Sequence, residues 1–143
     1  MTTRKMSSCL LLSVVLISAN AGVAQDEPPA KGGVDDSQLL IGDWHGESIC
    51  AVRPSACNDE KSVGHVRKAG DTPNRYSLQL DKIVDGKAID IGTVDCTYAP
   101  AQHALTCSVP KFVLNFTVQG KKMSGTMKLP DGTLWRNISL ARD

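Results

Sequence analysis

Three histidines, four aspartates and one serine are the side chains whose identity and placement in the sequence suggest metal, acid–base or nucleophilic chemistry. His45, His65 and His103 have no spacing that suggests a shared metal, and histidines on exposed strand positions are usually solvated. Ser124 precedes Gly125 but lacks the G-x-S-x-G turn that presents a nucleophilic serine. The sequence therefore predicts a protein that is not an enzyme and holds no metal.

Four aspartates recur through the middle of the chain, at Asp81, Asp85, Asp90 and Asp95. Two carboxylates could share general acid and base roles if their surroundings moved their pKa values apart. The sequence identifies no neighbour that would do so, and such residues are typical of the wet face of a sheet or of its turns. We expect them to be structural, and we predict no cofactor.

The chain has five cysteines, of which Cys9 lies in the N-terminal segment. The remaining four are Cys50, Cys57, Cys96 and Cys107, an even number that predicts two disulfides in an oxidising compartment. Neither pair has the C-x-x-C spacing of a zinc site. Four cysteines allow three pairings, and the strand pattern described below favours Cys50 with Cys57 and Cys96 with Cys107.

The N-terminus has the pattern of a secretory signal peptide. Arg4 and Lys5 precede an apolar run at residues 10–17, and small residues then allow cleavage after Ala24 or Ala21, of which we prefer Ala24. The run is shorter than the about 20 residues of a membrane span, and an uncleaved anchor is the alternative. We expect a secreted or periplasmic protein with no membrane span after cleavage.

The sequence predicts three parts of the chain. A signal peptide covers residues 1–24, a disordered linker rich in proline, glycine and acidic residues covers 25–38, and one folded domain covers 39–143. The formal charge of the whole chain is +1, and it is close to zero once Arg4 and Lys5 are removed. A basic face for phosphate backbones is absent, so we predict no nucleic-acid partner.

Period-two alternation with regularly spaced turn residues predicts an all-β domain. The expected strands cover residues 41–52, 62–68, 75–83, 88–98, 103–108, 111–118, 122–129 and 133–141. Short connections imply antiparallel neighbours, and closing the sheet removes its two exposed edges. We therefore predict a small eight-stranded antiparallel up-and-down barrel with two disulfides. A change of apolar phase predicts a bulge at Gly92 or Thr93.

The inward positions of this barrel decide whether it holds a ligand. Alternation points Leu134, Ile138 and Leu140 of the last strand inward. On the first strand Gly46 and Ser48 are small and leave space, which is either filled by large side chains from across the barrel or forms a small pocket. The residues predicted to line such a pocket are Ser48, Tyr98, Phe112 and Phe116.

The start of the domain, Gly42, Asp43 and Trp44, resembles the G-x-W opening of the first strand in lipocalins and related calycins. In that family an arginine on the last strand packs over the tryptophan, and Arg136 occupies a matching inward position. The resemblance implies that Trp44 and Arg136 form a structural plug at one barrel end. The chain is shorter than lipocalins and lacks their C-terminal helix, so a deep ligand cup does not follow. The segments around Trp44 and Arg136 also resemble bacterial secreted domains, a resemblance that implies no activity.

These features leave two functions open. The first is a barrel that binds a small hydrophobic molecule. The alternative is a protein-binding module such as a secreted protease inhibitor, because small periplasmic metalloprotease inhibitors also use a disulfide-bearing eight-stranded barrel. In that case residues 25–38 would be the working part. Trp135, out of phase with the core, marks either a contact surface or packing against the linker. The sequence does not determine the oligomeric state.

Overall fold

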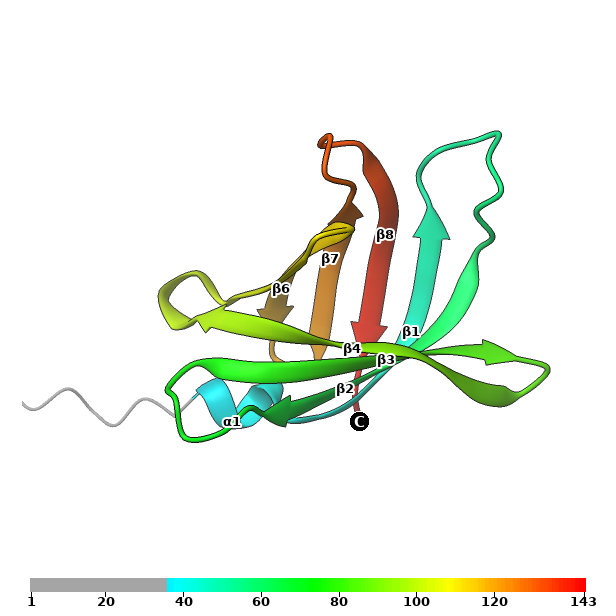
Figure 1. Ribbon diagram of the computed structural model, residues 1–143. Coiled ribbons are helices and arrows are strands. Elements are labelled where there is room, and N and C mark those ends of the chain that lie inside the picture. The colour runs from blue at the N-terminus through cyan, green and yellow to red at the C-terminus, as the bar shows by residue number, and fades with distance from the viewer. Residues whose placement is uncertain (1–35) are drawn as a thin grey trace, which may run out of the picture. The chain divides into compact units, whose positions relative to one another are not determined.

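The structure is a computed structural model that describes residues 36–143 (Figure 1). The expected signal peptide, Cys9 and most of the expected linker lie outside these residues. The elements, in chain order, are α1 (Asp36–Leu40), β1 (Gly42–Cys50), β2 (Glu60–Lys68), β3 (Arg75–Val84), β4 (Lys87–Ala99), a 3-10 turn (Pro100–Gln102), β5 (Ala104–Val109), β6 (Phe112–Gln119), β7 (Lys122–Lys128) and β8 (Leu134–Ala141).

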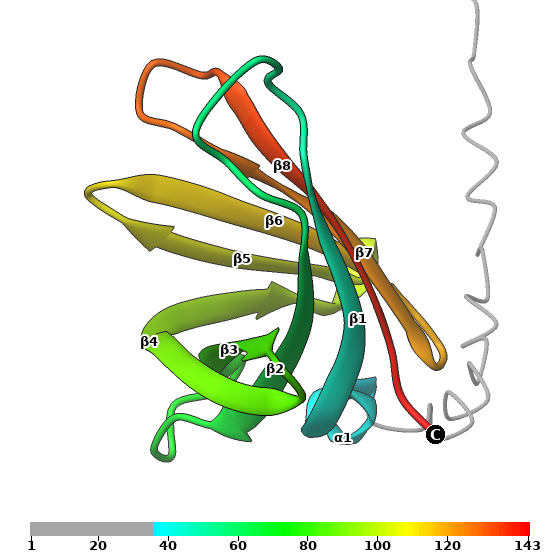
Figure 2. The same ribbon diagram turned by 90° about the vertical axis from the view of Figure 1, so that its right-hand side faces the viewer.

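The strands close into a barrel in which each strand pairs antiparallel with its neighbour in the chain and β8 pairs with β1. Figure 2 shows β1 and β8 running beside each other along this seam. The closed eight-stranded antiparallel barrel predicted from alternation is therefore confirmed. Closure gives the first and last strands a hydrogen-bonding partner on both sides.

The two ends of the barrel differ. Helix α1 and the connections after β2, β4 and β6 lie at one end, which we call the α1 end. The connections after β1, β3, β5 and β7 lie at the other, which we call the far end. Leu40 of α1 is fully buried, and its carbonyl accepts a hydrogen bond from Trp44 Nε1 at 2.9 Å. This packing explains why residues 36–38, assigned to the linker from sequence, form part of a helical turn.

Inward side chains fill most of the barrel. The buried apolar residues include Trp44, Val66, Tyr76, Leu78, Leu105, Leu114, Phe116, Val118, Met123, Ile138 and Leu140. Of the predicted inward residues on β8, Leu134 is the exception, because it is 37% exposed. Leu134 pairs with Lys128, whereas Arg136 pairs with Met127, so Trp135 is skipped in the register. This irregularity ends the inward phase before Leu134.

A second irregularity lies in the β3–β4 hairpin. Leu80 pairs with Gly92 and Asp81 pairs with Asp90, so the register skips Ile91. Gly92 has φ +131°, which is strained for any residue with a side chain. The bulge predicted at Gly92 or Thr93 is therefore present, with its extra residue directly before Gly92. It keeps the apolar residues on both sides of it on the inner face.

Both predicted disulfides are present. Cys50 bonds Cys57 across the β1–β2 loop, with Cα atoms 5.9 Å apart. Cys96 bonds Cys107, and these two residues stand directly opposite each other on β4 and β5. The two bonds indicate an oxidising environment outside the cytoplasm.

Candidate functional site

The four residues predicted to line a ligand pocket are spread along the barrel. Ser48 is buried near the far end, where it lines a small cavity. Tyr98 is buried near the α1 end, where it lines a different hollow. Phe116 is buried in the core, and Phe112 packs against the core beside the β5–β6 connection. The structure thus separates Ser48 and Tyr98 rather than joining them in one pocket.

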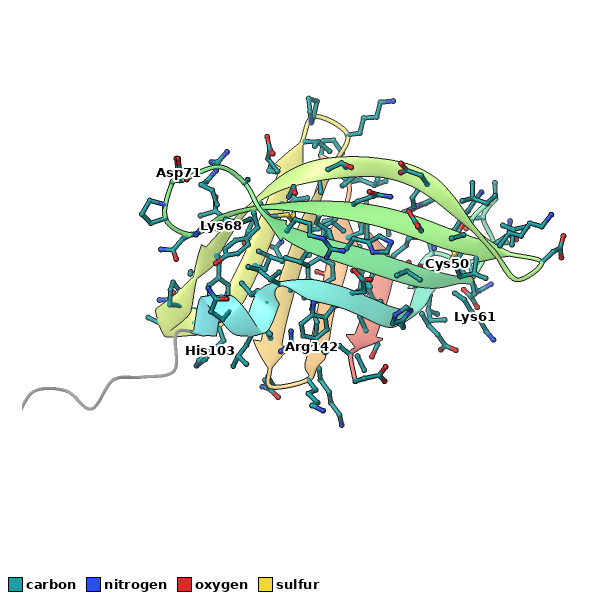
Figure 3. The ribbon with its side chains drawn as sticks, turned by 90° about the horizontal axis from the view of Figure 1, so that it is seen from below. Cys50, Lys61, Lys68, Asp71, His103 and Arg142 are labelled. Carbon is teal, nitrogen blue, oxygen red and sulfur yellow. A yellow bond between two sulfur atoms is a disulfide. The ribbon has the colours of Figure 1, made fainter. Side chains whose placement is uncertain are left out.

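The ring of Trp44 is covered by Arg142 and not by Arg136. The guanidinium carbon of Arg142 lies 5.1 Å from the centroid of the indole. Gly46 pairs with Leu140 across the barrel seam, so antiparallel pairing continues to bring Trp44 opposite position 142. The predicted plug was therefore wrong in its arginine. In Figure 3 the labelled Arg142 lies on the side of α1, where a cation over an indole face helps to close the barrel.

Arg136 instead occupies the interior at the far end. Its Nη1 donates to the Ser48 carbonyl at 3.2 Å and to Ser48 Oγ at 3.1 Å, and Nη2 donates to the Asn58 carbonyl at 3.0 Å. Glu60 Oε1 lies 3.4 Å from Nη2 and balances the charge. The cavity beside these groups has a volume of about 40 Å³. A water needs at least about 10–15 Å³, whereas pockets for drug-sized ligands span about 300–1,000 Å³.

Exposed large aliphatic side chains gather toward the far end. Among the residues that the structure describes, they are Ile49, Val84, Ile89, Ile91 and Leu134. Each stands in the half of its strand nearer the far end. Ile89 is 44% and Ile91 is 52% exposed, although both lie on the inner phase of β4. An inner-phase side chain is exposed only where no other element covers it, so this half of β4 extends past its cover.

The cause is the short pairing between β4 and β5. Only Cys96 to Ala99 of β4 pair with β5, whereas pairing with β3 runs from Lys87 to Thr97. Within residues 36–143, no strand pairs with the other side of residues 87–95. Figure 2 shows β4 and β5 diverging from this point. We call residues 87–95 the β4 edge.

A cluster of charged residues ties three strands together on the outer wall. His65 of β2 places Nδ1 2.8 Å from Asp43 Oδ1 of β1 and Nε2 3.2 Å from Asp81 Oδ2 of β3. Arg67 Nη2 donates to the same Asp43 oxygen at 2.6 Å, and Gln79 Nε2 donates to Asp81 Oδ1 at 3.1 Å. Carboxylates accept but do not donate, so both imidazole nitrogens must carry protons to serve both partners. The geometry therefore fits an imidazolium.

The same contacts shift two pKa values. The hydrogen bond that His65 donates to Asp43 raises the pKa of His65 above its ordinary value; burial opposes the shift, and the contact with Asp81 adds to it. The hydrogen bonds from His65 and then Arg67 lower the pKa of Asp43. Both shifts favour the charged forms, so His65 and Asp43 are each ionised over a wider pH range than they would be alone.

The other histidines lie apart from this cluster. His45 is exposed on β1, and His103 lies at the α1 end with Nδ1 3.5 Å from Tyr98 Oη. Among the described residues, no three His, Cys, Asp or Glu side chains are arranged to hold a metal ion. A helix long and apolar enough to cross a membrane is likewise not found in that part of the chain.

Comparison with curated proteins gives a weak similarity. No protein-family model matches the chain. The chain is 24% identical over 131 residues to the redox-sensing transcriptional repressor Rex of Streptomyces avermitilis. The match covers 90% of this chain and 50% of the repressor, so the chain spans about half the length of that protein. Identity at this level does not assign the chain to a family.

The contact between His65 and Asp81 was not predicted from the sequence, in which the two residues were interpreted as solvated and structural. The available signal was that Asp43, His65 and Asp81 all fall on the outward phase of the first three strands. Opposite charges on one face of adjacent strands can pair, but the sequence does not say which residues stand opposite each other. The β4 edge was missed because its exposure depends on where the pairing with β5 ends.

Proposed function

We propose that this protein is a secreted or periplasmic binding protein without catalytic activity, which captures an extended segment of another protein along the β4 edge. The supporting observation is that residues 87–95 are paired on one side only and carry the exposed Ile89 and Ile91. Unpaired backbone groups on a strand are a template for a further strand. Aliphatic side chains beside that edge add apolar contact to the backbone hydrogen bonds.

The local geometry favours a different protein over a second copy of this chain. The register irregularity at Ile91 bends the edge near its middle, and Asp90 Oδ1 accepts the backbone N–H of Gly92 at 2.7 Å. Bulges and charged residues on an edge are features that suppress self-pairing of sheets. A short segment of another protein can pair with β4 on one side of the bulge. Two copies of this chain that paired through their β4 edges would instead have to align a bend in each strand.

The compartment and family likeness belong to the same proposal. The signal-peptide pattern and the two disulfides support an exported protein. The closed eight-stranded barrel, with a cation over Trp44 of the G-x-W opening, supports a lipocalin-like origin. In this chain Arg142 would fill the place of the family arginine.

A small hydrophobic ligand inside the barrel is the less favoured function. The cavity of about 40 Å³ beside Ser48 and Arg136 offers room for a few water molecules. If soaking with a panel of apolar compounds raised the melting temperature, this function would gain support. A protease inhibitor that works through residues 25–38 also remains a prediction, because residues 25–35 lie outside those described.

We do not carry the role of the Rex repressor to this chain. That protein is named for redox sensing and transcriptional repression, and the match spans half of it at 24% identity. Repression acts on DNA, whose phosphates are bound through clustered Lys and Arg side chains. The formal charge of this chain is only +1.

Partner capture tests the proposal. Residues 25–143 would be immobilised and exposed to an extracytoplasmic extract, and bound protein would be identified and repurified. We expect I89K with I91K to weaken binding of the purified partner at least tenfold, because two charges would replace the aliphatic contact. Hydrogen exchange should slow at residues 87–95 when the partner binds, since their free backbone groups become bonded.

Matched variants separate the alternatives. I49K introduces the same charge at an exposed aliphatic residue on β1, away from the β4 edge, and should leave binding unchanged. Deletion of residues 25–35 should also leave it unchanged, whereas loss of binding in this variant would favour the inhibitor with a working tail. Unchanged binding by the I89K and I91K double variant would refute the proposal. A dimer in sedimentation analysis whose exchange slows at the edge would replace the foreign partner with a second copy.

A further inference from the structure

The charge balance around His65 depends on its proton. With His65 and Arg67 as cations and Asp43 and Asp81 as anions, opposite charges alternate across the outer wall of β1 to β3. Gln79 contributes a neutral donor to Asp81. The β4 residue that faces the hollow beside His65 is the neutral Thr93. Loss of the His65 proton would leave one ring nitrogen as a lone pair against a carboxylate oxygen that cannot donate.

Asp81 connects this cluster to the β4 edge. It is only 7% exposed and is the β3 residue at which the register changes. Its partner across the hairpin is Asp90, whose side chain holds the N–H of Gly92 and so fixes the bulge. Like charges directly opposite each other on paired strands are destabilising. His65 as a cation offsets this repulsion from the β2 side of Asp81.

We propose that the Asp43–His65–Asp81 cluster is a proton-operated clasp that holds the bulged half of β4 in its bound-ready shape when His65 is charged and loosens it when His65 is neutral. A strand already held in its bound shape binds a partner at a lower entropic cost, so loosening it would weaken partner capture. This consequence rests on the proposed function. The clasp itself is a property of the free protein.

The direction in which folding stability changes with pH follows from the difference between the folded and unfolded pKa values of His65. A group whose pKa is raised in the folded state contributes stability that is complete below its unfolded pKa, about 6.5 for histidine. That contribution is lost as the pH rises through the raised pKa of His65. The folded-to-unfolded ratio falls by about tenfold for each unit by which the two pKa values differ.

The test uses the free mature protein. NMR of the imidazole nitrogens would follow His65 between pH 5 and 9, and amide exchange, corrected for its intrinsic pH dependence, would follow residues 81–92. We expect His65 to be doubly protonated at pH 6 and to titrate above its ordinary value. Protection of the β4 edge should fall as His65 loses its proton, and it should fall by more than the protection of β6 and β7, which changes only with global stability.

Variants test whether His65 causes the change in protection with pH. In H65Q the protection of the β4 edge should no longer vary with pH, and H45Q, an exposed histidine on β1, should behave as wild type. Titration of His65 at or below its ordinary pKa would overturn the clasp. So would wild-type edge protection that stays constant while His65 titrates, a result that needs no variant to fold. These measurements use no partner, so they can refute the clasp without refuting partner capture. In the same way, the capture experiment can refute partner capture without refuting the clasp.

Discussion

Small residues let the barrel close at the seam between β1 and β8. Gly46 pairs with Leu140, and a Cβ atom at Gly46 would collide with the Ser139 carbonyl and lie 2.9 Å from Leu140 Cα. Both obstacles are backbone, which cannot move without displacing β8. Glycine at this position is therefore required by close strand approach rather than by a special backbone angle.

Replacing Gly46 tests this requirement. We expect G46A to lower the free energy of unfolding by about 3 kcal/mol, near the upper end of the usual cost of overpacking. Urea denaturation of the purified domain would measure the loss. G64A is the control, since a Cβ there would meet Leu78 Cδ1 at 3.1 Å, and a leucine methyl group can shift. Equal losses in the two variants would contradict the argument.

At the level of elements, the two disulfides contribute differently to stability. Cys96 and Cys107 are fully buried and join β4 to β5, which share only the pairs from Cys96 to Ala99. Cys50 and Cys57 close a loop with a sequence separation of 7, against 11 for the other pair. Chain entropy alone would make both similar, at about 2–3 kcal/mol each. Packing should make the β4–β5 bond the more important.

We expect the C96A and C107A double variant to lose about 3–5 kcal/mol of unfolding free energy, because a buried cavity adds to the entropy term. The C50A and C57A double variant should lose about 2 kcal/mol. Urea titrations with one probe on β4 and one on β7 would measure both. A larger loss from the loop disulfide would mean that the β1–β2 loop, and not the β4–β5 pairing, limits the stability of the wall.

Alternation predicted the faces of the strands but not the register that closes the barrel. The eight strands, both disulfides and the bulge near Gly92 depend on local patterns. The structure confirms the disulfides and the bulge, and it places the strand ends within two residues of the predicted ones. The partner of Trp44 depends on how β8 aligns with β1, which are far apart in the chain. Arg136 and Arg142 both lie on β8 or directly after it, and only the register between β1 and β8 determines which of them covers Trp44. The His65 cluster and the β4 edge were missed for the same reason, because both arise from pairing between strands.

At the scale of the whole barrel, the two ends are closed by different kinds of side chain. The α1 end is sealed by Leu40, the buried Trp44 ring and Arg142. The far end has Arg136 with polar partners around a small cavity, and the β4 edge with its exposed Ile89 and Ile91 lies toward it. A domain arranged this way can keep a stable base while its other end offers surface for a partner.

Disrupting the α1 end should therefore cost stability without affecting binding. L40A removes a fully buried side chain and should lower the unfolding free energy by about 2–4 kcal/mol. In a W135F background the emission of Trp44 should move to longer wavelength, since the indole loses part of its cover. L39A changes a partly exposed neighbour and should do neither. Partner affinity at a temperature where L40A stays folded should match wild type. A large loss of affinity would show that the two ends are mechanically coupled and that the base helps to position the β4 edge.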